Sequence, residues 1–140
     1  MKEAIVALVI FAAVAAFFAA CRNKSSGGSS TTIQAGALCT VDDGEGSFRV
    51  AKILVADDTA VHIRLYANRW KQRPTLAEVE QAKLSMGNIN NKAEGFGMGH
   101  LPLSRQTFAH WQAAPLKLIP VADDELEGYK LWKEANGGLF

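Results

Sequence analysis

The residues that could do chemistry in this 140-residue chain are concentrated in the segment HIRLYANRWKQR, residues 62–73. Arginines alternate there with aromatic side chains, a composition typical of surfaces that stack on bases and contact phosphate. In a strand, this alternation places side chains on one face about 7 Å apart. The alternative is the solvated face of an edge strand, with its aromatic residues partly buried. We predict a binding surface formed by His62, Arg64, Tyr66, Arg69 and Trp70.

Three histidines, His62, His100 and His110, are candidates for metal binding or acid–base catalysis. None has a second histidine or a carboxylate at a recognised ligand spacing such as H-E-x-x-H. Ser47 and Ser104 lie in no nucleophile elbow, and the acidic turns do not match a calcium loop. We therefore predict no catalytic residue, no metal site and no cofactor. A small periplasmic hydrolase using His62 or His100 is the alternative.

The two cysteines are predicted to differ in role. Cys39 lies in the apolar stretch GALCTV, and no histidine is near it in sequence to generate a thiolate. We predict a buried structural cysteine there, with an intermolecular disulfide or catalysis as the alternatives. Cys21 directly follows the uncharged run Ala4–Ala20. This run covers only about 25 Å as a helix, whereas a permanent span needs ~30 Å.

A basic start, an apolar middle and small residues before the cut are typical of a secretory signal peptide. The tetrapeptide Phe18-Ala19-Ala20-Cys21 resembles the lipobox of bacterial lipoprotein precursors, with Phe18 where an aliphatic residue is usual. The resemblance implies that Cys21 is lipidated and becomes the first residue after cleavage. An uncleaved N-terminal transmembrane anchor is the alternative. We expect a signal peptide at 1–20, the lipidated cysteine with a flexible Ser/Gly tether at 21–32, and one globular domain at 33–140.

The clearest structural pattern is a β-hairpin of Phe48–Ala56 and Ala60–Trp70, joined by an Asp-Asp-Thr turn. Val61, Ile63 and Leu65 alternate onto its inner face. A short strand at Ala37–Val41 completes a three-stranded meander. Farther along, residues 87–99 are rich in glycine and asparagine and predict a long mobile loop.

Three helix starts follow from capping patterns. Thr75 with Glu78 has capping-box spacing, Ser104 precedes a short helix, and Asp123 precedes a helix with an acidic first turn. Leu116–Val121 reads as an edge strand because it contains a proline. The predicted class is α+β: a small, mostly antiparallel sheet built on a β-hairpin, with two or three short helices, behind an N-terminal apolar leader helix.

The segments HIRLYANRW, GHLPLS and ELEGYKLWKEANGGLF together look like a small bacterial domain family of unknown function, over most of Phe48–Phe140. The resemblance implies a recurring fold and brings no activity with it. Secretion favours lipid phosphates, acidic polymers or acidic proteins as partners over nucleic acid. We expect a lipoprotein of the cell envelope, membrane-anchored and facing the periplasm or cell exterior. Its noncatalytic domain binds an envelope protein or polymer, an immunity-type inhibitor of a secreted toxin being one form.

Overall fold

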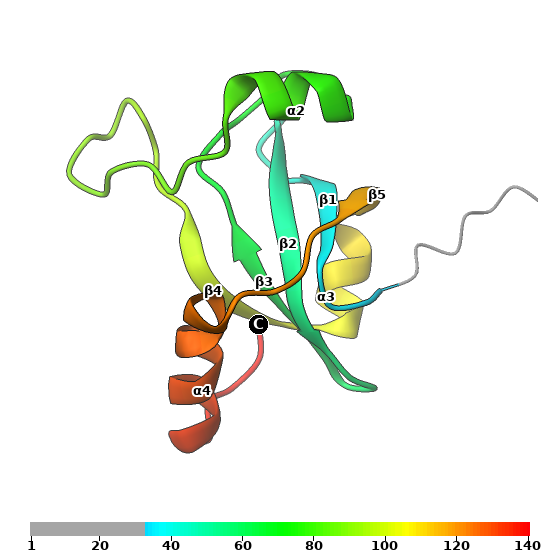
Figure 1. Ribbon diagram of the computed structural model, residues 1–140, viewed down its shortest axis with the longest axis vertical. Helices are drawn as coiled ribbons and strands as arrows, with labels where there is room; N and C mark the ends of the chain where they lie inside the picture. The colour runs from blue at the N-terminus through cyan, green and yellow to red at the C-terminus, as the bar shows by residue number, and fades with distance from the viewer. Residues whose placement is uncertain (1–32) are drawn as a thin grey trace, which may run out of the picture. The chain divides into compact units, whose positions relative to one another are not determined.

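A five-stranded antiparallel sheet lies at the centre of the part of the chain that the computed structural model describes, residues 33–140. The strand order is β4-β3-β2-β1-β5 (Figure 1). The predicted α+β class and antiparallel sheet are therefore confirmed. The expected signal peptide, leader helix, lipobox and tether lie outside the described residues. The strands are β1 (Ala37–Asp42), β2 (Phe48–Ala56), β3 (Ala60–Leu65), β4 (Met98–Ser104) and β5 (Ala114–Leu118).

The predicted hairpin is formed by β2 and β3, and Ile53 pairs with Ile63 across it. Asp57 closes the turn, because its Oδ1 accepts hydrogen bonds from the backbone N–H groups of Thr59 and Ala60. Such side-chain bonds are the reason that aspartate is frequent in turns. β1 pairs antiparallel with β2, so the predicted meander is also confirmed.

The second strand of the hairpin is shorter than predicted, because β3 ends at Leu65 rather than at Trp70. Tyr66 still donates its N–H to the carbonyl of Val50, and the chain then leaves the sheet. It returns at Trp70, which exchanges two backbone hydrogen bonds with Phe48. The prediction extended the strand because aromatic residues are common in strands, although this preference reflects packing and not backbone geometry.

Strand β4 is absent from the sequence prediction, which assigns residues 87–99 to a loop. The strand begins at Met98, inside that range. The sequence pattern did not indicate this strand, because it contains Gly99 and Pro102, and both residue types are depleted in strands. Pro102 is tolerated because its missing N–H faces the outer edge of β4. On that edge, its carbonyl accepts a hydrogen bond from the N–H of Phe140 at 3.0 Å.

Two of the three predicted helix starts are confirmed. Thr75 and Glu78 form a reciprocal capping box, and the side chain of Ser104 accepts a hydrogen bond from the N–H of Thr107. Within residues 33–140, no helix has the length and apolar character needed to cross a bilayer. The helices are α2 (Leu76–Ala82), α3 (Arg105–His110), the 3₁₀-helix η1 (Asp123–Leu126) and α4 (Glu127–Glu134).

The predictions at the C-terminal end need two corrections. Asp123 is not a cap but the first residue of η1; the cap is Ala122, whose N–H donates to the carboxylate of Glu125 at 2.9 Å. The edge strand predicted at Leu116–Val121 begins two residues earlier, as β5. The prediction excluded Pro115 from the strand, but β5 includes it, because among the described strands β5 pairs with β1 alone and an edge strand tolerates proline.

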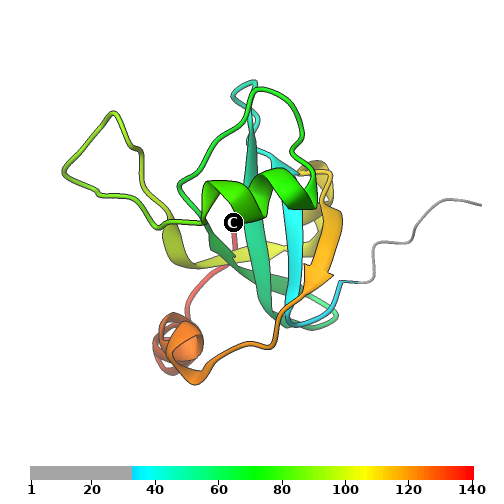
Figure 2. The same cartoon turned by 45° about the horizontal axis from the view of Figure 1, so that its top comes forward.

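The sheet has helices on both faces: α2 lies in front of it and α3 behind it in Figure 2. The face toward α3, here called the α3 face, carries the larger apolar cluster, to which Phe108 contributes. Burying such a side chain stabilises the fold by about 1.5–3 kcal/mol. The opposite face, the α2 face, has a smaller cluster centred on Leu38, Val50 and Val79. Cys39 is buried on the α3 face, as predicted, and burial raises the pKa of its thiol to about 11.

Candidate functional site

A cavity of about 190 Å³ on the α3 face, the Arg49 pocket, is the candidate site. It lies where β1 and β3 end and where β2 and β4 begin, because antiparallel strands bring alternate ends to one edge of a sheet. α3 has six residues and is only about 9 Å long, so it leaves part of this face uncovered. The pocket is lined by Val41, Asp43, Glu45, Arg49, Leu65, Arg69, Met98, Leu101 and Trp111.

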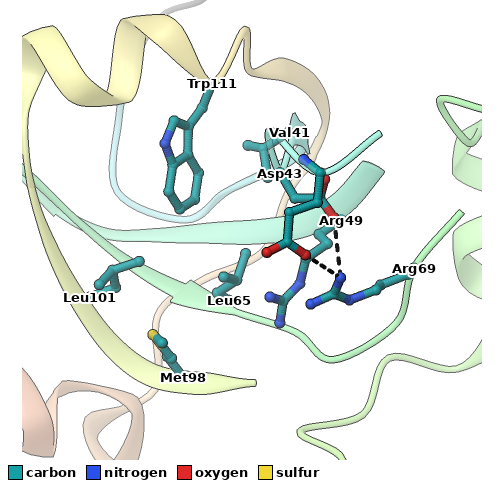
Figure 3. Close-up of a pocket in the computed structure, with 9 residues that line it drawn as sticks. Val41, Asp43, Arg49, Leu65, Arg69, Met98, Leu101 and Trp111 are labelled. Atoms are coloured by element: carbon teal, nitrogen blue, oxygen red, sulfur yellow. Dashed lines mark hydrogen bonds and ion pairs between the residues drawn. The ribbon is translucent and has the colours of Figure 1, made fainter. Parts of the chain in front are cut away.

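One wall of the Arg49 pocket is apolar. Trp111 ends α3 and packs against the core cluster of the α3 face, as does Leu101 of β4. Met98, at the start of β4, is 39% exposed. Figure 3 shows these three side chains on one side of the cavity, with Leu65 between them and the charged residues. Indole and thioether groups are polarizable and pack well against apolar ligand atoms.

The opposite wall is built on Arg49, which is only 7% exposed. Its Nε–H and one Nη2–H donate to the carbonyl of Tyr66 at 3.0 and 2.7 Å, and Nη2 also donates to the carbonyl of Phe96 at 2.9 Å. A guanidinium has five N–H donors. Among the described residues, no hydrogen bond engages Nη1, and no carboxylate forms an ion pair with Arg49. The arginine is thus held rigidly but keeps donors to offer.

Arg69 stands beside Arg49 and is paired instead. Its Nη1 lies 2.9 Å from Oε2 of Glu45 and 3.6 Å from Oδ2 of Asp43. Dashed lines in Figure 3 mark the ion pairs of Arg69. The Asp43 carboxylate also accepts hydrogen bonds from the hydroxyl and N–H of Ser47. The acidic turn between β1 and β2 is therefore occupied by Arg69 and by its own backbone.

The charges of the pocket shift two pKa values. Burial, followed by the positive charge of Arg69, lowers the pKa of the Arg49 guanidinium, although the carboxylates of Asp43 and Glu45 oppose this shift. Arginine nevertheless stays protonated in proteins. Burial alone raises the pKa of Asp43, but hydrogen bonds from Ser47 and Glu45 and the charge of Arg69 outweigh it, so the pKa lies below its usual value. The wall therefore combines two cations, Arg49 and Arg69, with two carboxylates, those of Asp43 and Glu45.

The structure does not bring the five predicted binding residues onto one surface. Arg69 alone lines the Arg49 pocket. Tyr66 and Trp70 pack beside the small cluster of the α2 face. The guanidinium of Arg64 lies 5.9 Å from the Tyr66 ring, and its Nε is buried without a partner among the described residues. His62 is 1% exposed. β3 is an interior strand, so the alternative of an edge-strand face is wrong as well.

His62 is enclosed by an aromatic cluster. Its Nδ1 lies 3.0 Å from Nε2 of His100, and the two rings are stacked. Tyr129 and Trp132 of α4 meet the His62 ring edge-on at 4.8 and 4.5 Å between centroids. α4 approaches closely because Gly128 has no Cβ: one placed there would lie 2.6 Å from Cβ of His100. Burial is the main cause that lowers both histidine pKa values.

A buried ion pair fixes the adjoining η1 to the α2 face. Lys52 is 4% exposed, and its Nζ lies 2.8 Å from Oε2 of Glu125 and 3.0 Å from the carbonyl of Pro120. The third histidine, His110, is exposed on α3, and among residues 33–140 its ring bonds only to the carbonyl of Gln106 in its own helix. Within residues 33–140, no three histidine, cysteine, aspartate or glutamate side chains gather as a metal site would require.

Sequence reasoning missed Arg49 and Trp111 as site residues. A usable signal existed for Arg49: it shares the alternation of Ala51 and Ile53 on β2, and those side chains face the core. A charged residue at an inward position of a strand is costly unless it has a structural or binding role. No comparable signal marked Trp111, because its place in the pocket depends on how α3 packs.

Comparisons of the chain with protein-family models, with curated proteins and with solved structures give no match.

Proposed function

We propose that the protein is a membrane-tethered lipoprotein of the bacterial cell envelope whose domain binds an envelope protein or polymer without catalysing a reaction. The Arg49 pocket carries this proposal. It combines an apolar wall with a buried arginine whose Nη1 donors have no partner among residues 33–140. Pockets that combine an apolar lining with a few fixed polar groups are typical of ligand recognition, and Arg49 supplies such a group here.

The alternative of a hydrolase using His62 or His100 is less well supported. His62 is almost wholly buried, and its Nδ1 is already engaged by His100. Neither histidine lines the Arg49 pocket. The buried Cys39 is a poor nucleophile, because burial raises its pKa to about 11 and little thiolate forms at neutral pH.

The tether is proposed from the apolar run, the lipobox-like tetrapeptide and the Ser/Gly segment, all of which precede the described residues. Acylation in this class takes place on the thiol, so Cys21→Ser should abolish incorporation of radiolabelled palmitate and leave the leader attached. Cys39→Ser is the matched control and should keep the label. Label retained in Cys21→Ser contradicts the proposed anchor.

Binding through the pocket is tested by capture from an envelope extract on the immobilised full-length protein. Met98→Ser changes an exposed apolar side chain that lines the pocket. Leu131→Ser is the control, because Leu131 is a 61% exposed apolar side chain of α4 outside the pocket. We expect Met98→Ser to retain at least tenfold less of the specific partner and Leu131→Ser to retain as much as the parent. If the parent and Met98→Ser capture the same amount of partner, the partner does not bind through the Arg49 pocket.

A further inference from the structure

We infer that the Arg49 pocket recognises a peptide segment of its partner in which a bulky apolar side chain stands beside a carboxylate. This inference rests on the proposed function and specifies its ligand. The apolar side chain contacts Trp111, Leu101 and Met98, and the carboxylate accepts hydrogen bonds from Nη1 of Arg49. The two walls face one another across the cavity in Figure 3.

The carboxylate follows from the state of Arg49. Three of its N–H groups are used by the carbonyls of Tyr66 and Phe96, which fix the guanidinium in place. The remaining two, on Nη1, have no partner among the described residues. A buried, preorganised cation without an ion pair gains most from an anionic acceptor, since charge-assisted hydrogen bonds are about twice as strong as neutral ones. The ligand carboxylate therefore takes the place of the ion-pair partner that Arg49 lacks among the described residues.

A single negative charge fits better than a phosphate dianion. Asp43 and Glu45 also line the pocket, and their carboxylates would repel a second ligand charge. Arg69 cannot neutralise that charge, because it is already shared between these two carboxylates at 2.9 and 3.6 Å. The two N–H groups on Nη1 of Arg49 therefore match one carboxylate of the ligand.

The apolar half of the ligand follows from the other wall and from the volume. Trp111, Leu101 and Leu65 continue the core cluster of the α3 face, so an apolar group placed there extends that cluster. A cavity of about 190 Å³ is smaller than the roughly 300–1,000 Å³ of sites that enclose drug-sized ligands. It accommodates one large side chain with its neighbouring carboxylate. The rest of the partner would lie outside the pocket.

The test uses small probes that separate these two features. Full-length protein labelled with ¹⁵N-tryptophan, in detergent micelles, gives indole signals from Trp70, Trp111 and Trp132. It is titrated with N-acetyl-L-leucine, with its uncharged amide, and with N-acetylglycine. Trp132 serves as an internal control, because its ring packs against His62 on the α2 face. The three probes differ only in the carboxylate or in the apolar side chain.

We expect N-acetyl-L-leucine to shift the Trp111 signal with a Kd on the order of 1 mM, which is typical of such small fragments. The amide and N-acetylglycine should each bind at least tenfold more weakly, a factor that corresponds to about 1.4 kcal/mol. Arg49→Gln should remove the preference for the carboxylate over the amide. The comparison of probes on the parent protein keeps the test decisive even when this variant does not fold.

Three results overturn the inference. If the acid and the amide bind equally, the pocket does not recognise a carboxylate. If the leucine and glycine derivatives bind equally, it does not recognise an apolar side chain. If no probe shifts the Trp111 signal, it recognises neither. The proposed function fails separately, when Met98→Ser still captures the partner of the parent. Partner capture that depends on Met98 while no probe moves Trp111 would retain the binding function and reject this ligand chemistry.

Discussion

Buried polar side chains lie on both faces of the sheet, and they differ in whether they have a polar side-chain partner. On the α2 face, Lys52 is paired with Glu125, and His62 is bonded to His100. We call this set of four residues the closed cluster. On the α3 face, Arg49 is also buried but forms no ion pair within residues 33–140.

This contrast separates structural roles of buried polar groups from recognition roles. In the closed cluster, the paired groups fasten η1 and α4 to the sheet, so their contacts are made within the domain. Arg49 is held by two backbone carbonyls and lines a cavity, and its Nη1 has no hydrogen-bond partner among the described residues. A buried charge costs stability unless it is compensated. The buried cation that forms no ion pair among the described residues is therefore the better indicator of a ligand.

The largest effect is expected from opening the closed cluster. Glu125→Gln keeps the size of the side chain but leaves the Lys52 ammonium without its counter-charge. Removing one partner of a buried ion pair costs about 3–5 kcal/mol. The free energy of unfolding, measured by urea denaturation, should fall by that order.

Two variants control this prediction. Glu80→Gln removes a partner of Lys117 from an exposed pair, and it should change the free energy of unfolding by less than about 1 kcal/mol. The double variant Lys52→Met with Glu125→Gln removes both buried charges and should recover much of the loss. A loss equal to that of Glu80→Gln would show that the closed cluster does not stabilise the fold.

A smaller effect is expected from acid, acting on the same cluster. Burial lowers the pKa of His62 and of His100, so in the folded state both bind protons less readily than in the unfolded chain. The nearby Asp57 opposes this shift at His62, and the charge of His62 adds to it at His100. The stability that these histidines contribute is therefore complete above about pH 6.5 and decreases as the pH falls.

The melting temperature should thus decrease by a few degrees between about pH 7 and pH 5. His100→Gln removes one of the two titrating groups and should flatten this dependence, whereas His110→Gln, which alters an exposed histidine outside the cluster, should not. The same slope in parent and His100→Gln would mean that other groups cause the acid sensitivity.

Local patterns predicted the elements of this fold whose determinants are near one another in the sequence. The hairpin, the capping box at Thr75 and the cap at Ser104 depend on residues within a few positions. β4 was missed because it is stabilised by distant partners, namely β3 and the backbone of Phe140. A prediction from local sequence cannot include these partners, and the glycine and proline of this segment argue against a strand.

The site was harder to predict for the same reason. Alternation correctly assigned Val61, Ile63 and Leu65 to the core, but it treated the other face of β3 as open. α2 and α4 cover that face, and their packing depends on contacts far along the chain. The segment HIRLYANRWKQR bends out of the sheet after Tyr66. This bend directs Arg69 to the pocket while Arg64 stays on the α2 face.

The smallest effect on stability, and the sharpest test of the comparison, is expected from Arg69→Ala and Arg64→Ala taken separately. Arg69 is 46% exposed at its side chain, so its loss should change the free energy of unfolding by less than about 1 kcal/mol. It should nevertheless weaken partner capture severalfold, because Asp43 and Glu45 would lose their cation and become free to attract Arg49. Arg64→Ala, on the opposite face, should leave capture unchanged. Circular dichroism is the folding control, and loss of capture with Arg64→Ala alone would move the binding surface from the Arg49 pocket to the α2 face.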